Sequence, residues 1–256
     1  MDLGLKDGVA LITGGGGGIG AAEALCFSQE GMCIAINDID ATAAQRVVDG
    51  LRDRGINAAA FCGDACDEDA VQRVVDDVLA HFGRLDVLVN NAGIGVKPAY
   101  AVADMPLAAW DGMLQSHLRS TFLFSRAAFK PMRAAKFGRI VNTSSMNFTG
   151  GGRPGVAHYA AAKAGIAGFT RTLAKEAGPY GITANAIAPG YVETALIDGF
   201  TDDMRARLYR QNPVGRPCRP DEVAALVAFL ASGQAAFING ALVCMDGGRR
   251  DFYWGE

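Results

Sequence analysis

The stretch VALITGGGGGIG, residues 9–20, decides the fold of this chain. Its first four residues form a short apolar run typical of a strand, and a helical pattern from Ile19 to about Glu30 follows the five glycines. Glycine permits positive φ and lets backbone amides approach a pyrophosphate, which the helix dipole also attracts. The order of strand, glycine-rich loop and helix indicates a dinucleotide-binding turn, with a flexible turn as the alternative for the loop alone.

Two glycine templates fit this loop, and the loop alone does not separate them. The pattern G-x-G-x-x-G places its glycines at 15, 17 and 20, whereas T-G-x-x-x-G-x-G places Thr13 before glycines at 14, 18 and 20.

Asp38 ends the second predicted strand, at the place where a carboxylate accepts hydrogen bonds from the ribose hydroxyls of adenosine. It would also repel a 2′-phosphate, and no Lys or Arg stands at 14–18, 37 or 39 to neutralise one. The sequence therefore favours NAD over NADP. The alternative role of Asp38 is to cap the helix that starts near Ala41.

Strand-like and helix-like segments alternate along the whole chain, which predicts parallel strands with helices on both faces. No linker and no repeat divides it, so we expect an α/β, doubly wound parallel sheet (Rossmann fold) in a single domain, residues 1–256. The expected strands are 9–12, 32–36, 58–62, 85–89, 139–143, 182–188 and 242–245. The expected helices are 19–30, 41–54, 71–82, 107–135, 158–178 and 220–231. The irregular segments are 92–106, 146–157 and 190–219, on the side where such sheets bind ligands.

Composition narrows the class of protein. A net charge of −3 shows no basic surplus, so we expect no nucleic acid and no membrane surface as a partner. The N-terminus lacks the pattern of a secretory signal and no apolar run approaches 18 residues. Of the six cysteines only Cys62 and Cys66 are close, without His or Cys nearby, which predicts reduced thiols and no metal site. We expect a cytoplasmic protein.

A second group of residues carries acid–base chemistry. Tyr159 and Lys163 stand four residues apart, hence on one face of a helix. Burial raises the pKa of a phenol above about 10, whereas a nearby cation favours the phenolate. Alone, a tyrosine and a lysine at this spacing are often an ordinary exposed pair. Here Thr143, Ser144 and Ser145 end the preceding strand, and this combination favours a functional site over an exposed pair.

Five features together resemble a short-chain dehydrogenase/reductase of about 250 residues. They are the loop 13–20, NNAG at 90–93, the set of Ser145, Tyr159 and Lys163, APG at 188–190 and DGG at 246–248. The resemblance covers roughly residues 6–248 and favours the T-G-x-x-x-G-x-G template. It implies that Tyr159 is the general acid/base, that Lys163 lowers its pKa and holds the nicotinamide ribose, and that Ser145, rather than Ser144, donates to the substrate oxygen.

The same resemblance implies a cofactor site for NAD. Asp64 would bind adenine, and Pro189, Val192 and Thr194 would meet the carboxamide. The full set of expected cofactor residues is Gly14, Gly18, Ile19, Gly20, Asp38, Asp64, Asn90, Gly93, Tyr159, Lys163, Pro189, Val192 and Thr194.

His117 departs from the family's pattern, which commonly has asparagine there. The family's residue offers a backbone carbonyl, opened by a local helix irregularity, to a water that links the lysine to solvent. Three alternatives stay open for this candidate catalytic residue. The backbone role survives, the imidazole joins the relay through its pKa near 6.5, or the ring is a core histidine in an altered site.

We therefore expect an oxidoreductase that transfers a hydride between NAD and a secondary alcohol or ketone. The alternatives are a reductase of 3-oxoacyl thioesters on acyl carrier protein, and a catalytically dead nucleotide-binding regulator. A mostly apolar set of wall residues predicts a bulky or cyclic, uncharged substrate: Ile94, Met146, Phe148, Tyr191, Leu196 and Tyr209. The resemblance implies a homotetramer, in which the aromatic tail 252–254 would dock at a subunit interface.

Overall fold

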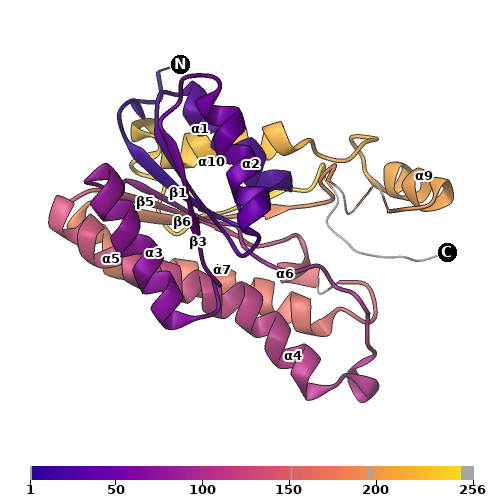
Figure 1. The fold of residues 1–256 in the computed structure, drawn as a ribbon. Helices are drawn as coiled ribbons and strands as arrows, with labels where there is room; N and C mark the ends of the chain where they lie inside the picture. The colour runs from indigo at the N-terminus through magenta and orange to yellow at the C-terminus, as the bar shows by residue number, and fades with distance from the viewer. Residues whose placement is uncertain (1, 151, 195–196, 198, 249–256) are drawn as a thin grey trace.

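Seven parallel strands form one sheet at the centre of the molecule, in the order β3-β2-β1-β4-β5-β6-β7 (Figure 1). This computed structural model describes residues 2–150, 152–194, 197 and 199–248. The strands are β1 (Val9–Thr13), β2 (Cys33–Asp38), β3 (Ala58–Cys62), β4 (Val87–Asn90), β5 (Gly138–Thr143), β6 (Ile182–Pro189) and β7 (Leu242–Met245). The expected doubly wound sheet in a single Rossmann-like domain is confirmed.

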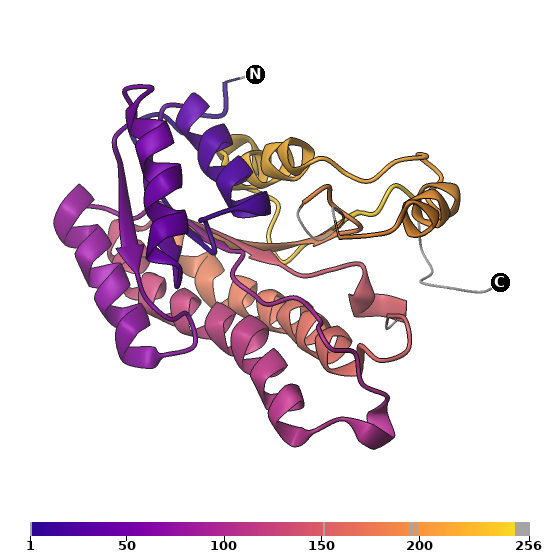
Figure 2. The same cartoon turned by 45° about the vertical axis from the view of Figure 1, so that its right-hand side comes forward.

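Helices cover both faces of the sheet. One layer holds α1 (Gly18–Gln29), α2 (Ala41–Arg52) and α10 (Pro220–Ala231). The other holds α3 (Glu68–Phe82), α5 (Ser120–Ala135) and α7 (Ala157–Ala177). Helix α4 (Leu107–Leu114) precedes α5 in the chain and packs beside α7. Figure 2 shows the two layers on either side of the strands. The short helices are α6 (Asn147–Gly150), η1 (Val102–Asp104), η3 (Gly178–Tyr180) and η4 (Gly233–Ala235).

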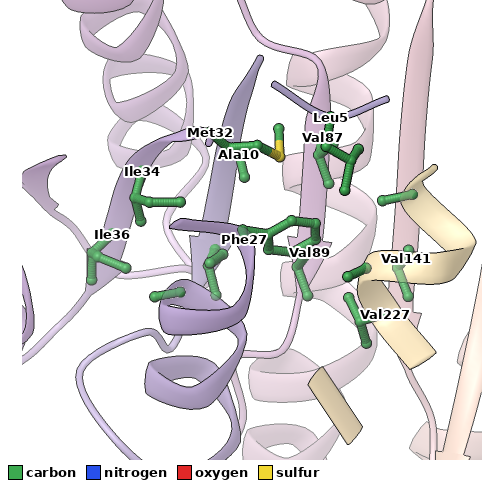
Figure 3. Packing of buried hydrophobic residues seen from close by; sticks show 14 of the residues in the cluster. Leu5, Ala10, Phe27, Met32, Ile34, Ile36, Val87, Val89, Val141 and Val227 are labelled. Carbon is green, nitrogen blue, oxygen red and sulfur yellow. The ribbon is translucent and has the colours of Figure 1, made fainter. Parts of the chain in front are cut away.

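The core is divided by the sheet into two layers, because successive side chains of a strand point to opposite faces. On β1, Ile12 packs in the layer that contains Phe27 of α1, whereas Leu11 packs in the layer that contains Phe124 of α5. Figure 3 shows the first layer, where Phe27 lies among the side chains of the strands. Burial on both faces explains why the strands read as continuous apolar runs.

Two segments differ from the sequence-based expectation. The helix expected at 107–135 is interrupted by a π-helical segment, η2 (Gln115–Arg119), between α4 and α5. The expectation that 190–219 is irregular is wrong for α9 (Asp202–Gln211). This helix is mostly polar, so it lacks an apolar stripe; Thr201 caps its first turn and an Asp203–Arg207 ion pair spans one turn.

The described residues bear on three further expectations. No helix among them is long and apolar enough to cross a membrane. Within the same ranges no group of His, Cys, Asp or Glu side chains is arranged to hold a metal ion. Leu196 and the aromatic tail at 252–254 lie outside the described residues.

Glu23 is a charged residue type in a fully buried position. It lies on the stripe of α1 formed by Gly20, Glu23, Ala24, Phe27 and Ser28, which faces the core. Its exposed fraction is 0%, and within the described part of the chain neither carboxyl oxygen has a hydrogen-bond partner. Burial disfavours the carboxylate and raises the pKa of Glu23 from 4.5 to about 8.

The raised pKa makes stability depend on pH. Between about 4.5 and 8 the unfolded chain releases this proton while the folded chain keeps it, so Glu23 lowers the free energy of unfolding as pH rises through that window. We expect Glu23→Gln to be more stable than the wild type at pH 8 and to lose this advantage at pH 5. Urea unfolding at the two pH values measures the difference. The exposed Glu176→Gln on α7 is the control, and an equal effect of both variants would contradict the prediction.

Candidate active site

The loop after β1 turns sharply because of three glycines. Gly14 and Gly18 have φ of 63° and 55°, in the left-handed region. At Gly20 a Cβ atom would lie 2.5 Å from the carbonyl oxygen of Gly14. By contrast, Gly17 has extended backbone and open space where a Cβ would stand. The geometry thus requires glycine at 14, 18 and 20, the positions of the T-G-x-x-x-G-x-G template.

Asp38 is held against this loop at the end of β2. One carboxylate oxygen accepts from the backbone N–H of Gly16 at 2.9 Å and the other from Asp40 at 3.0 Å. The cap of α2 is Asp40, which accepts from Thr42 and Ala43. Asp38 therefore does not cap α2, and because a carboxylate offers about four acceptor positions, about two remain for a ligand.

Thr13 and Asn91 join the loops after β1 and β4, and both were missed as individual site residues. The Thr13 hydroxyl accepts from the N–H groups of Asn91 and Ala92 at 3.1 and 3.0 Å. The Asn91 amide donates to the carbonyls of Thr13 and Gly14, both at 3.2 Å. Their signal was present in the T-G and N-N-A-G motifs that contain them.

The side chain of Asn90 turns into the protein interior instead. Its amide donates to Ser125 Oγ at 3.0 Å and to Asn142 Oδ1 at 2.8 Å, and the Asn142 amide donates to Thr170. Only the backbone of Asn90 is left to line a cofactor.

Ser145, Tyr159 and Lys163 come together where β5 ends beside α7. The Tyr159 phenol hydrogen-bonds the Ser145 side chain. Lys163 Nζ donates to the carbonyl of Thr143 at 2.7 Å and lies 5.7 Å from the centre of the Tyr159 ring. Ser144 is used elsewhere, since its hydroxyl donates to the carbonyl of Lys163. Ser145 is therefore the serine that faces the phenol.

Burial shifts the ionisation of both groups on α7. It lowers the pKa of Lys163 from 10.5 to about 7, because the ammonium is almost fully removed from water. It raises the pKa of Tyr159, because the phenolate is disfavoured, and the hydrogen bond with Ser145 opposes that rise. Two titratable side chains with shifted pKa values thus lie side by side on α7.

His117 lies in the middle of η2, and its ring reaches the same place. The ring packs edge to face with Tyr159 at 5.3 Å between centres, and Nε2 lies 3.0 Å from the carbonyl oxygen of Ile94. The His117 carbonyl accepts from the hydroxyls of Ser120 and Thr121 at 3.0 and 2.8 Å. The helix irregularity expected at this position is present.

The remaining expected site residues lie on the same edge of the sheet. Thr194, after β6, has its methyl carbon 3.7 Å from the position a Cβ would take at Gly18. Pro189 ends β6 and its carbonyl accepts from Met146, while Val192 is bridged to Cys218. Asp64 follows β3 and accepts from the N–H of Cys66.

A family model described as enoyl-(acyl carrier protein) reductase matches residues 14–250 of this chain. The chain belongs to the short-chain dehydrogenase/reductase family. It is 42% identical over 240 residues to cis-4-hydroxycyclohexanecarboxylate dehydrogenase of Sinomonas cyclohexanicum, covering 94% of this chain and 95% of the relative. It is 35% identical to the 3-oxoacyl-acyl-carrier-protein reductase FabG of Staphylococcus aureus, covering 93% and 96%. The crystal structure of gox2181 superposes with a TM-score of 0.90 at 34% identity, covering 95% of each chain.

Short-chain dehydrogenases/reductases are oxidoreductases that bind a nicotinamide cofactor, and the residues of this chain fit such a group. The first turn of α1 has no side-chain cap, so its N–H groups are available to an anion. Gly17 and Gly18 are exposed there, and Asp38 offers a carboxylate at the adjoining strand end. The cradle therefore combines anion donors for a pyrophosphate with an acceptor for ribose hydroxyls.

The buried amine of Lys163 lowers the stability of this short-chain dehydrogenase/reductase. Between about pH 7 and 10.5 the unfolded chain keeps the Lys163 proton that the folded chain has released, so stability rises with pH through this window. Lys163→Met removes this titration together with the hydrogen bond to Thr143, so we expect the free energy of unfolding of the variant, relative to the wild type, to be higher at pH 7 than at pH 9. Urea unfolding tests this, with the exposed Lys175→Met on the same helix as control. A difference that does not change between the two pH values would contradict it.

Proposed function

We propose that this protein is an NAD-dependent oxidoreductase that interconverts a secondary alcohol and its ketone. The observation that carries the proposal is the position of buried Lys163, whose Nζ lies 5.7 Å from the centre of the Tyr159 ring and donates to the carbonyl of Thr143, two residues before Ser145. This set lies at the carboxyl edge of the sheet, on the same side as the glycine loop and Asp38.

The proposed cofactor site extends along that edge. Gly14, Gly18, Ile19 and Gly20 would receive the pyrophosphate at the start of α1. Asp38 would accept from the adenosine ribose, Asp64 would lie near adenine, and the backbone of Asn90 and Gly93 would line the next section. Pro189, Val192 and Thr194 would meet the carboxamide, with Tyr159 and Lys163 at the nicotinamide ribose.

The roles of the side chains follow from their contacts. The nicotinamide, held beside Tyr159 and Lys163, would supply the hydride acceptor for oxidation of the alcohol and the hydride donor for reduction of the ketone. Tyr159 takes the hydroxyl proton of the alcohol as phenolate, or gives its proton to the ketone oxygen as phenol. Ser145 donates a hydrogen bond to the same oxygen and stabilises the charge that develops on it.

The segments that follow β4, β5 and β6, at the same edge of the sheet as Ser145, carry apolar side chains. Ile94 is 53% exposed after β4, and Met146 is buried after β5. The Tyr191 ring lies edge-on to Phe200 at 6.1 Å between centres. This supports a bulky or cyclic substrate, and the relative cis-4-hydroxycyclohexanecarboxylate dehydrogenase is named for a ring alcohol that also carries a carboxylate. The uncharged substrate, the cytoplasmic location and the homotetramer stay predictions.

A panel assay tests the proposed reaction. NADH formation would be followed by absorbance with cyclohexanol, cis-4-hydroxycyclohexanecarboxylate and open-chain secondary alcohols, and its consumption with a 3-oxoacyl thioester. Turnover of the thioester alone would favour the acyl-carrier-type reductase. Turnover of nothing would favour a nucleotide-binding regulator.

Asp38 leads to a prediction on cofactor choice. Its carboxylate would repel a 2′-phosphate, so kcat/KM with NAD should exceed that with NADP by at least about tenfold, or about 1.4 kcal/mol. Asp38→Asn, which removes the charge and keeps an acceptor, should narrow this ratio. Asp49→Asn on the outer face of α2 is the control and should leave the ratio unchanged. Comparable kcat/KM with both cofactors in the wild type would contradict the assignment.

Tyr159→Phe removes one oxygen and keeps the ring. We expect turnover to fall by about 100-fold or more, the usual contribution of a general acid/base, while NADH binds nearly as before by fluorescence titration. Tyr180→Phe in η3, three residues after the end of α7, is the matched control, because it makes the same change at an exposed tyrosine. A variant that kept more than about a tenth of the wild-type rate would remove Tyr159 from this role.

A further inference from the structure

The segment that follows β4 has few ties to the rest of the protein. Between Gly93 and Ala99 its backbone makes one internal hydrogen bond, from the N–H of Lys97 to the carbonyl of Gly95 at 3.2 Å. Tyr100 is the next residue that is held, by the carbonyl of Gly155 at 3.1 Å. Over residues 93–99, the hydrogen bond of Ile94 with His117 Nε2 is the only one that reaches another part of the described chain.

The His117 ring also packs closely on this segment. A Cβ atom at Gly93 would collide with Cε1 and Nδ1 of the ring, so glycine is the residue that lets the imidazole in. On its other side the ring meets Tyr159 edge to face. His117 is itself buried, with an exposed fraction of 4%, and it is held on the π-helical segment η2. The imidazole therefore joins three separate parts of the active-site edge.

The ionisation of His117 favours a neutral ring. Burial lowers the pKa of His117 well below the ordinary value of histidine; Lys163 and His158 act in the same direction, and the hydrogen bond with the Ile94 carbonyl opposes them. A neutral imidazole carries one N–H, and a carbonyl can only accept, so the proton lies on Nε2 facing Ile94. Nδ1 is then a bare acceptor, buried and without a partner among the described residues.

We propose that His117 is a positioning residue, whose imidazole holds the segment Gly93–Ile94 against Tyr159 and so sets the wall beside the reacting carbon. The assignment rests on the proposed function, because it takes that wall to border substrate. His117 acts through Ile94 and Tyr159 and carries no proton itself.

Two substitutions separate the two ring nitrogens. The amide nitrogen of glutamine is three bonds from Cβ, as is Nε2 of histidine, whereas that of asparagine is two bonds away, as is Nδ1. Since the contact with Ile94 uses Nε2, His117→Gln can restore the hydrogen bond and His117→Asn cannot. Both amides are neutral at every working pH, so neither can replace a titrating relay.

The kinetic test compares kcat and KM of the two variants with those of the wild type, with NAD as cofactor and the alcohol of the panel that the wild type oxidises fastest. We expect His117→Asn to raise KM for the alcohol by about tenfold, the upper effect of one lost hydrogen bond, with kcat changed less than about threefold. We expect His117→Gln to stay within about threefold of the wild type in both constants. The pH profile of kcat should keep its shape in both variants.

Limited proteolysis gives a readout that needs no turnover. Thermolysin cuts before Ile and Val, so a released segment should be cut faster at Ile94 or Val96. We expect faster cutting in His117→Asn and an unchanged rate in His117→Gln, with the sites identified by mass spectrometry. If the wild type shows no turnover, the proposed function fails and this arm still tests the positioning role.

Three results would overturn the proposal. Equal losses in both variants, together with a displaced pH profile, would make the imidazole a proton relay. Wild-type KM and wild-type cutting in His117→Asn would show that the segment is held without the ring. A loss in His117→Gln alone would mean that Nδ1, not Nε2, makes the important contact.

Discussion

The hydrogen bond from Lys163 Nζ to the carbonyl of Thr143 joins the two elements on which the candidate site is built. It ties α7 to the end of β5, and the Ser144 hydroxyl adds a second tie to the carbonyl of Lys163. With helix and strand end held together, Tyr159 on α7 and Ser145 after β5 face each other. The ammonium that makes this contact is almost completely buried, so the site depends on a group whose charged form the surrounding protein disfavours.

The fold could be predicted from the sequence because its strands are buried on both faces and its helices on one. Runs such as 9–12 and stripes such as 71–82 reveal those two environments directly. Helix α9 could not be found in this way, since its side chains are mostly polar and its start depends on a single capping threonine. The ends of the elements differ from the expected ends by up to three residues, as at the start of α3, because hydrogen bonding rather than burial sets them.

For the candidate site, motifs located the residues but not their partners. Ser144 and Ser145 are identical in type and adjacent, and only the structure shows which of them faces Tyr159. Asn90 stands in a motif, yet its side chain binds Ser125 and Asn142 in the interior. His117 stood out by its residue type alone, whereas its contact with Ile94 depends on a backbone carbonyl that carries no sequence signal.

The close approach of Gly16 to Asp38 restricts the order in which this loop can change. A Cβ at Gly16 would lie 2.8 Å from Asp38 Oδ2 and 2.8 Å from the Ala43 methyl, while the Gly16 N–H already binds that same oxygen. A larger residue at 16, including a basic one that could neutralise a phosphate, would therefore clash with the Asp38 carboxylate. Shortening the side chain at 38 removes one of these two obstacles, and the Ala43 methyl remains as the other. A mutational path toward a phosphorylated cofactor therefore has a preferred direction, with positions 38 and 43 changing ahead of position 16.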